Sequence, residues 1–177
     1  MIKIKSFYYL CIILFSFSTL CYADNNLAYI NIDLILSESE PAKKLFLQLK
    51  DKENKVIEQI KKNEENLKIE ESKILSSKNI ISTDEYNKNV SDFKNKVNEY
   101  KRIKNETIQK LNKQRQNEIM RFLKLINPII EKIMTDKSIE ILIEKKNIFI
   151  AKSNYDITQF VINDINNNIK NFLIEKK

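Results

Sequence analysis

The sequence predicts an α+β chain that is mostly α-helical: a small oligomeric β body, a long protruding antiparallel coiled-coil hairpin and a C-terminal helix. Between Pro41 and Pro128 lie 86 residues with neither glycine nor proline, dense in Lys, Glu, Asn, Gln and Ile. This composition is typical of long, water-facing helix. Short Ile-rich segments with a strand-like pattern stand on both sides of this run. Because a hairpin of this length buries little core of its own, we expect it to be an exposed arm on a β body.

Residues 1–23 have the features of a cleaved secretory signal peptide. Lys3 and Lys5 make the start basic, Phe7–Leu20 is apolar, and Cys21–Ala23 resembles a small-residue cleavage site. The apolar stretch is shorter than the roughly 20 residues that a membrane-spanning helix needs. We therefore expect a mature chain that begins at Asp24.

The residue types that are missing exclude several classes of function. The chain has no His and no Gly, and its two cysteines, Cys11 and Cys21, fall in the expected signal peptide. Histidine is the commonest general base and transition-metal ligand, and nucleotide-binding phosphate loops need glycine. We therefore expect no enzyme activity, no cofactor, no metal and no disulfide.

The positive charge is unevenly distributed. The formal net charge is +7, yet residues 24–40 carry four acids and no base. Residues 86–126 carry 11 bases against four acids. The sequence therefore predicts a basic second half of the helical run and an acidic opening segment.

The body is expected to comprise residues 24–40 and 135–177. Alternation and β-forming residues predict a strand over Leu27–Leu36. Two further strands are expected at Ile139–Ile143 and Ile148–Ala151, joined by a tight polar turn at Lys145-Lys146-Asn147.

The hairpin arm is expected over residues 41–134. Pro41 suits a first helical turn, so a helix is predicted over 41–77. A tip turn follows at 78–82, in which Asn79 would take the left-handed cap conformation. Ser82 and Glu85 form a capping box that opens the second helix, predicted over 83–134.

Apolar side chains on the two helices predict a packing seam between them. The first helix repeats its apolar positions at eleven-residue spacing, which favours a nearly straight or slightly right-handed coil. The seam of the second helix is apolar at both ends and polar in the middle, which suits either a bent, hydrated coil or a flexible arm. Pro128 is expected to kink this helix near the body. The apolar positions of the first helix are Leu45, Phe46, Leu49, Val56, Ile57, Ile60 and Leu67. The seam positions of the second are Tyr86, Val90, Phe93, Val97, Tyr100, Lys104, Thr107, Leu111, Arg115, Glu118, Phe122, Ile126, Ile129 and Ile133.

A last amphipathic helix is predicted from Asp156, which would cap it together with Gln159. Its apolar positions are Ile157, Phe160, Val161, Ile165, Ile169 and Phe172.

The order of these parts resembles the Skp/OmpH family of periplasmic chaperones. The resemblance covers nearly the whole mature chain and lies in its motifs: Leu27-Ala28-Tyr29-Ile30-Asn31-Ile32-Asp33, Ser39-Glu40-Pro41-Ala42, Asn127-Pro128-Ile129-Ile130-Glu131-Lys132-Ile133, Ile141-Leu142-Ile143, Ile148-Phe149-Ile150 and Asp156-Ile157-Thr158. It implies a periplasmic homotrimer whose strands build a central β body. Three helical arms would surround a cavity that holds unfolded outer-membrane proteins without ATP. The chain departs from the family in lacking glycine at the strand turn.

Two sets of residues are expected to carry this function. The strands expose apolar edges that would pair with other copies through Ile30, Ile32, Ile141, Ile143, Ile148 and Ile150. Basic and apolar side chains of the arm would contact clients: Ile80, Ile81, Lys94, Lys96, Lys101, Arg102, Lys104, Ile108, Lys113 and Arg115.

Other functions compete with this one. A coiled-coil stalk anchored by an uncleaved N-terminal segment would explain the apolar start and the long helices, but not the strands. Nucleic-acid binding has no motif in the sequence, and a signal peptide opposes it. Contact with lipopolysaccharide or another anionic membrane surface is compatible with the basic arm.

Overall fold

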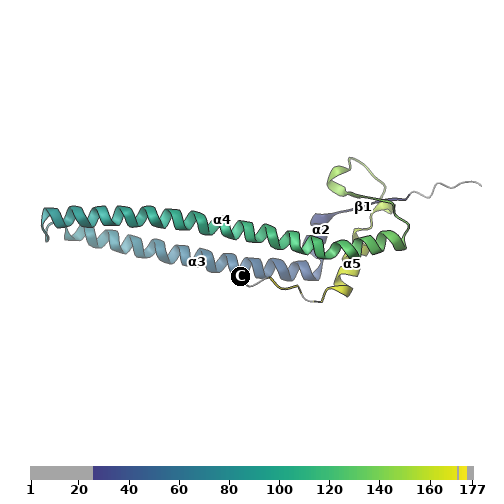
Figure 1. The fold of residues 1–177 in the computed structure, drawn as a ribbon, viewed down its shortest axis with the longest axis horizontal. Helices are drawn as coiled ribbons and strands as arrows, with labels where there is room; N and C mark the ends of the chain where they lie inside the picture. Colours follow the sequence, from purple (N-terminus) through teal and green to yellow (C-terminus); the bar gives the residue numbers. More distant parts are fainter. Residues whose placement is uncertain (1–25, 171, 175–177) are drawn as a thin grey trace, which may run out of the picture.

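The protein is described by a computed structural model that covers residues 26–170 and 172–174 (Figure 1). The expected signal peptide, residues 1–23, lies outside these residues. A long helical hairpin extends from one side of a small body that holds two short strands and two further helices. Within the described ranges, no helix is both long and apolar enough to cross a membrane.

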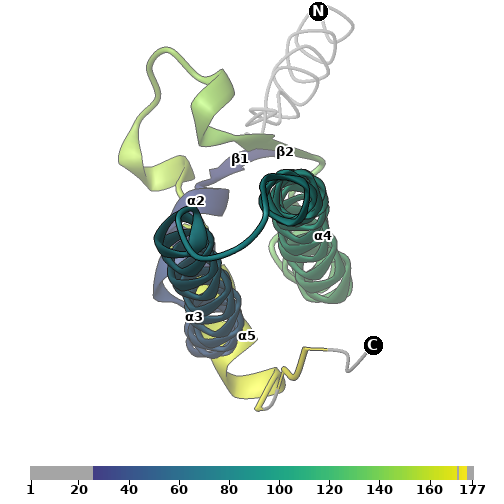
Figure 2. The ribbon, with the colours of Figure 1, turned by 90° about the vertical axis from the view of Figure 1, so that its left-hand side faces the viewer.

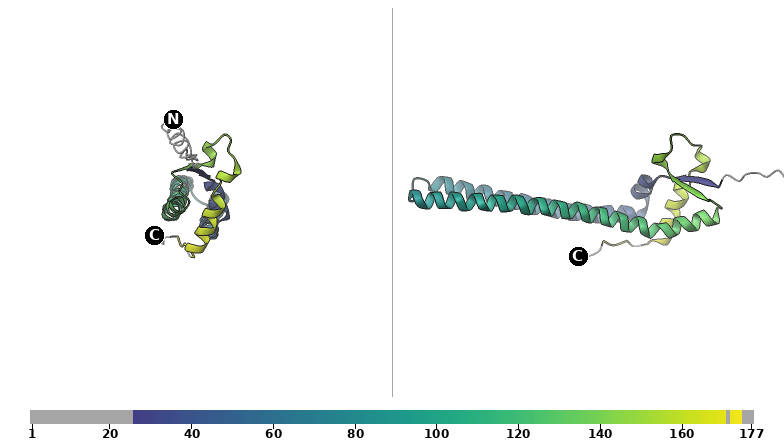
Figure 3. Two further views of the ribbon diagram at one scale, coloured as in Figure 1. Left: turned by 90° about the vertical axis from the view of Figure 1, so that its right-hand side faces the viewer. Right: turned by 45° about the horizontal axis from the view of Figure 1, so that its top comes forward.

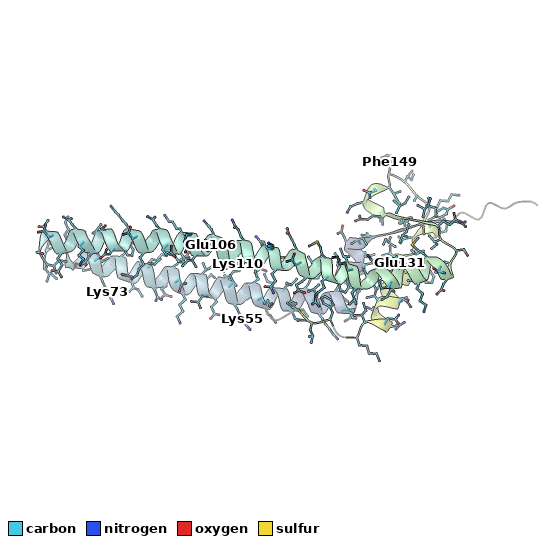
Figure 4. All side chains as sticks on the ribbon, in the orientation of Figure 1. Lys55, Lys73, Glu106, Lys110, Glu131 and Phe149 are labelled. Carbon is cyan, nitrogen blue, oxygen red and sulfur yellow. The ribbon has the colours of Figure 1, made fainter. Side chains whose placement is uncertain are left out.

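The hairpin consists of α3 (Glu40–Ser77) and α4 (Thr83–Asp136), of 38 and 54 residues. At about 1.5 Å per residue these helices measure roughly 57 and 81 Å. They run side by side from the tip and meet the body at the other end (Figures 1 and 2). The charged side chains labelled along the arm, Lys55, Lys73, Glu106 and Lys110, belong to its solvated surface (Figure 4). The predicted hairpin is confirmed.

The tip turn confirms one predicted cap and contradicts the other. The Ser82 hydroxyl accepts a hydrogen bond from the Glu85 N–H at 3.3 Å, as expected of an N-cap. Asn79 does not take a left-handed conformation, so that prediction is wrong. The carbonyl of Ser77 instead accepts from Ile80 N and Ile81 N, at 2.9 and 3.2 Å, and closes the turn without positive φ.

The helix α4 continues through Pro128 and ends at a left-handed residue. It changes direction near the body, just before Glu131 (Figures 1 and 4). At its end Ser138 has φ 53°, and Ile139 N donates to Met134 O at 2.8 Å. Ser138 N donates to Thr135 O at 3.2 Å. These two bonds form the Schellman motif, here closed by serine in place of glycine.

The sheet is a parallel pair of short strands, β1 (Leu27–Ile30) and β2 (Ile141–Glu144), with Leu27 opposite Ile141. The predicted first strand is right only to Ile30. The next segment is the helix α2 (Ile32–Glu38), so the strand predicted up to Leu36 is wrong.

The helix α2 begins where Asn31 caps it. The Asn31 side chain accepts from Leu34 N at 3.1 Å, and Asn31 N donates to Thr158 Oγ1 at 2.9 Å. Helical spacing then buries Ile35 in the core. Capping and burial together favour helix over the alternating strand that the sequence suggests.

The strand predicted over Ile148–Ala151 is also wrong. Lys145–Asn147 does turn, as one turn of 3-10 helix (η1), but the following residues form no strand. The favoured hairpin turns need positive φ, usually from Gly or Asn. None of Lys145–Asn147 has it, so the chain does not fold back onto β2. A second 3-10 turn, η2 (Ser153–Tyr155), leads to the last helix.

The last helix, α5 (Thr158–Asn168), is shorter than predicted. Asp156 accepts from Thr158 N at 2.9 Å, so it orders the first turn, although Ile157 is the N-cap residue. Gln159 donates to Asn163 rather than back toward Asp156. Ile169 and Phe172, predicted as helical, lie beyond the helix.

The core lies where the hairpin meets the body. Residues at the base of both arm helices pack with β1, α2 and α5, so the hairpin and the body share one core. Its fully buried side chains include Ile35, Ala42, Leu45, Phe122, Ile126, Val161 and Ile165.

Candidate functional site

The polar middle of the seam contains an ion pair between the two arm helices. Lys104 Nζ lies 2.6 Å from Glu64 Oε1, and the Lys104 ammonium lies 6.0 Å from the centre of the Tyr100 ring. The Tyr100 hydroxyl donates to the carbonyl of Ile60 at 3.4 Å. The hydrogen bond from Lys104 is the largest cause that lowers the pKa of Glu64. Burial, followed by Glu64, raises the pKa of Tyr100.

A second ion pair, Lys96 to Glu70 at 2.6 Å, joins the same helices nearer the tip. Both pairs are partly exposed, so each contributes little to stability alone. Their value lies in fixing which residues of α3 face which residues of α4. The polar seam therefore encodes the register of the hairpin.

Beside the ion pairs lies an open groove of about 630 Å³. Its apolar lining comes from Leu67, Phe93, Val97 and Tyr100, on both helices. The charged and polar residues along it are Glu64, Lys68, Glu71, Lys94, Asn98, Lys101 and Lys104. The groove thus combines an apolar floor with a mainly basic rim. Such a surface suits an apolar chain segment that carries acidic groups.

The structure places the residues expected to bind clients along much of the arm. Lys94, Lys101 and Lys104 line the groove. Lys96 is paired with Glu70, and Arg102 with Glu99 and Glu106, both at 2.6 Å. The hydrogen bond from Arg102 lowers the pKa of Glu99.

The remaining candidates lie at the tip and nearer the body. Ile80 is exposed at the tip, and Ile81 is half-buried beside it. Ile108 and Lys113 are exposed on α4. The Arg115 guanidinium lies 6.0 Å from the centre of the Phe46 ring. Arg115 is exposed and the neighbouring Gln114 is partly buried, so the seam prediction fails at Arg115.

The residues expected to join subunits fall into different surroundings. Ile30 is buried in β1, and Ile32 belongs to α2 rather than to a strand. Ile141 and Ile143 lie in β2, where Ile141 is exposed. Ile148 and Ile150 lie in the irregular segment after η1. Beside Ile150, which is 85% exposed, Phe149 extends fully into solvent (Figure 4).

The predicted site residues did not include the α3 side of the groove, which consists of Glu64, Leu67, Lys68 and Glu71. The excess of bases after Tyr86 points to α4 alone. A signal for the α3 side does exist, because residues at similar distances from the tip turn face each other in a hairpin.

The chain matches the model of the family described as "Outer membrane protein (OmpH-like)" over residues 26–165. None of the curated proteins compared with it matches. Among solved structures, it resembles that of an OmpH-like protein from Caulobacter crescentus CB15, described as an outer membrane chaperone. The two share 16% sequence identity with a TM-score of 0.79, over 86% of this chain and 90% of the other. At this identity the likeness shows a common fold, while the family match spans most of the sequence. The chain belongs to the OmpH-like outer membrane protein family.

Proposed function

We propose that this protein is a periplasmic holdase chaperone that binds unfolded outer-membrane proteins between basic helical arms, without ATP. The observation that carries the proposal is the groove at mid-arm, in which Phe93 and Val97 form an apolar floor beneath Lys94 and Lys101. Membership of the OmpH-like family supports a chaperone role. So does the similar fold of a protein described as an outer membrane chaperone.

The shape of the arm fits the retention of an unfolded chain. The groove is open, and further apolar side chains, such as Ile80 and Ile108, are scattered along the arm between charges. Each contact is small, so many weak contacts hold a client without fixing its conformation. Basic side chains attract acidic clients from a distance, and this attraction weakens as salt increases.

We also propose that three copies of the chain assemble through their bodies. The two-stranded parallel sheet is smaller than the sheets that are stable alone in water. Phe149 and Ile150 are neighbouring large apolar side chains, and both are almost fully exposed to solvent in the single chain. Pairing at β2 and covering of residues 148–151 by neighbouring copies would remove both features.

One experiment tests the holdase proposal. A denatured outer-membrane β-barrel protein is diluted into buffer with purified residues 24–177 and no nucleotide, and light scattering follows its aggregation. We expect suppression at a ratio of about one trimer per client. Light scattering of the protein alone gives its mass. A monomer that leaves aggregation unchanged would refute the proposal.

The assembly is tested separately by Phe149→Ser with Ile150→Ser. These side chains lie outside the core, so helix content should stay unchanged while the mass falls to that of a monomer. An intact trimer would refute their role in assembly. The alternative of an anchored stalk is tested by mass spectrometry of the exported protein, since an uncleaved Met1–Ala23 would favour it.

A further inference from the structure

After α5, Lys170 and Phe172–Ile174 belong to no helix or strand and lie along the base of the hairpin (Figure 1). We call this segment the strap, defined by Lys170 and Phe172–Ile174. It lies on the side of the hairpin opposite β1 and β2 (Figures 2 and 3). Lys44 Nζ donates to the carbonyl of Lys170 at 3.3 Å, near the start of the strap. The strap thus contacts α3 at this end.

One side chain of α3 binds the backbone of the strap as a neighbouring strand would. Gln48 Nε2 donates to the carbonyl of Phe172, and Ile174 N donates to Gln48 Oε1, both at 3.1 Å. A carboxamide presents the same donor and acceptor as a peptide group. The carbonyl of one residue and the N–H two residues later are the groups that an adjacent parallel strand engages. This contact recognises an extended backbone whatever its side chains.

The side chains of the strap alternate as they do in a strand. Phe172 and Ile174 are 4% and 8% exposed, whereas Leu173 between them is 71% exposed. The Phe172 ring meets the Phe122 ring edge to face, with 5.4 Å between centres. The site therefore has one place for an aromatic side chain and one for an aliphatic side chain two residues later.

Helix α4 supplies the third wall of this site. The Arg121 guanidinium carbon lies 4.3 Å from the centre of the Phe172 ring, and Arg121 Nη2 donates to the carbonyl of Leu173. The buried Glu118 carboxylate accepts from Arg121 at 2.8 and 3.0 Å and fixes the guanidinium over the ring. Arg121 is thus oriented by α4 itself, independently of the sequence of the strap.

We propose that the base of the hairpin is a second client-binding site, for an extended segment with an aromatic side chain followed two residues later by an aliphatic one. The strap fills this site as an internal occupant, and a client displaces it. The identity of the occupant rests on the proposed function: membrane-spanning strands of outer-membrane barrels alternate apolar and polar residues. Their apolar face matches the spacing of Phe172 and Ile174.

A tethered strap competes strongly with a free peptide. A short linker holds a ligand near its site at an effective concentration in the millimolar range. Removing the strap should therefore tighten binding of a free peptide by about tenfold or more. Loss of the two Gln48 hydrogen bonds should weaken peptide binding by about tenfold or more.

The test uses a fluorescein-labelled synthetic peptide of alternating apolar and polar residues that contains Phe and Ile two positions apart. Fluorescence anisotropy measures its binding to the full chain and to a chain truncated after Lys170. We expect at least about tenfold tighter binding to the truncated chain. Gln48→Ala should abolish this gain. Gln59→Ala is the matched control, because Gln59 lies on the same helix and bonds only to Asn63 among the described contacts.

Equal binding by both chains, or no effect of Gln48→Ala, would overturn the proposal. So would equal binding of a peptide of the same composition whose Phe and Ile are adjacent. If the truncated chain does not fold by circular dichroism, Phe172→Ser in the full chain replaces it, with the same gain required. Suppression of aggregation by the full chain is measured in parallel. If the protein suppresses aggregation but the peptide does not bind as expected, the holdase function stands and this site is refuted. If the peptide binds as expected but aggregation is not suppressed, the holdase function alone is refuted.

Discussion

Asn166 of α5 accepts a hydrogen bond from the backbone N–H of Glu40, the first residue of α3, at 2.8 Å. The start of the arm is thus capped by a side chain 126 residues away in sequence. Ser39, the N-cap residue itself, makes no side-chain cap, and among the described residues its buried hydroxyl has no hydrogen-bond partner. Pro41 lacks the N–H that such a hydroxyl often binds. The start of the arm is therefore capped by Asn166 of the body rather than by the side chain of the neighbouring Ser39.

Asn166→Ala should destabilise the protein by about 1 kcal/mol, because the first N–H of α3 loses its acceptor. Urea unfolding followed by circular dichroism, at one fixed protein concentration, measures this change. Exchange of Asn167, which is exposed on the same helix, for Ala is the control and should change stability by less than about 0.5 kcal/mol. Equal effects at both positions would contradict the capping role.

Ser39→Ala should leave the free energy of unfolding unchanged or raise it slightly. Replacing an N-cap serine by alanine usually lowers that free energy by about 1 kcal/mol. The reason is that the variant removes a buried hydroxyl that has no partner. The same urea titration measures it. A loss of about 1 kcal/mol or more would show that the hydroxyl is paired in solution.

Ser138→Gly should stabilise the protein by about 0.5–1 kcal/mol. Ser138 has φ 53°, where a side chain costs about 1 kcal/mol and glycine costs little. Ser91→Gly, within α4, is the opposite control and should lose about 0.5 kcal/mol. Thermal unfolding compares the two variants with the parent protein. A Tm that falls for Ser138→Gly would contradict the assignment of the Schellman motif.

The hairpin could be predicted from sequence because its signals are local. Each signal acts over a few residues of the chain: helical periodicity predicts the two long helices, Pro41 lies in the first turn of α3, and Ser82 caps α4. The helix α2 could not be predicted, because the bond from Asn31 N to Thr158 Oγ1 joins residues 127 apart. A residue pattern that suits both strand and helix is decided by such distant contacts.

The site was predictable only in part for the same reason. The basic residues of α4 are visible as an excess of charge, and Lys94 and Lys101 do line the groove. Which residues of α3 complete it depends on the register of the hairpin. Ion pairs such as Lys104 to Glu64 fix that register, and neither partner is conspicuous among the many charged residues.

The ion pair across the seam should make arm stability depend on pH. Lys104 lowers the pKa of Glu64 below its ordinary 4.5, so this stabilisation is present above about pH 4.5 and lost as pH falls through the folded pKa. Glu64 in turn raises the pKa of Lys104. The stabilisation from the ion pair is therefore also lost when pH rises through the folded-state pKa of Lys104. Glu64→Gln should therefore be less stable than the parent at about pH 6 and equal to it near pH 2.

Urea unfolding at both pH values measures this difference. Glu65→Gln, the adjacent exposed carboxylate, is the control and should shift stability little at either pH. A Glu64→Gln deficit that persists unchanged near pH 2 would mean that packing, rather than charge, is lost in the variant.

Reversing the charge of Lys94 and Lys101 together should weaken binding of a denatured outer-membrane barrel by about tenfold, because both lysines line the apolar groove. Reversing Lys55 and Lys73, two exposed lysines of α3 that are not among the groove residues, changes the net charge equally (Figure 4). This matched pair should cost no more than about threefold, since it alters only the long-range field. Tryptophan fluorescence of the client measures its affinity, because the present chain has no Trp.

Salt separates the two contributions. At about 0.5 M salt the screening length falls to roughly 4 Å, so the effect of Lys55 and Lys73 should vanish. The effect of Lys94 and Lys101 should shrink but persist, because a client seated on Phe93 and Val97 keeps its acidic groups within contact distance of these lysines. Equal losses for both pairs at every salt concentration would assign client binding to net charge and leave the groove without a role. A surplus loss at Lys94 and Lys101 in high salt would locate the bound client on the groove itself.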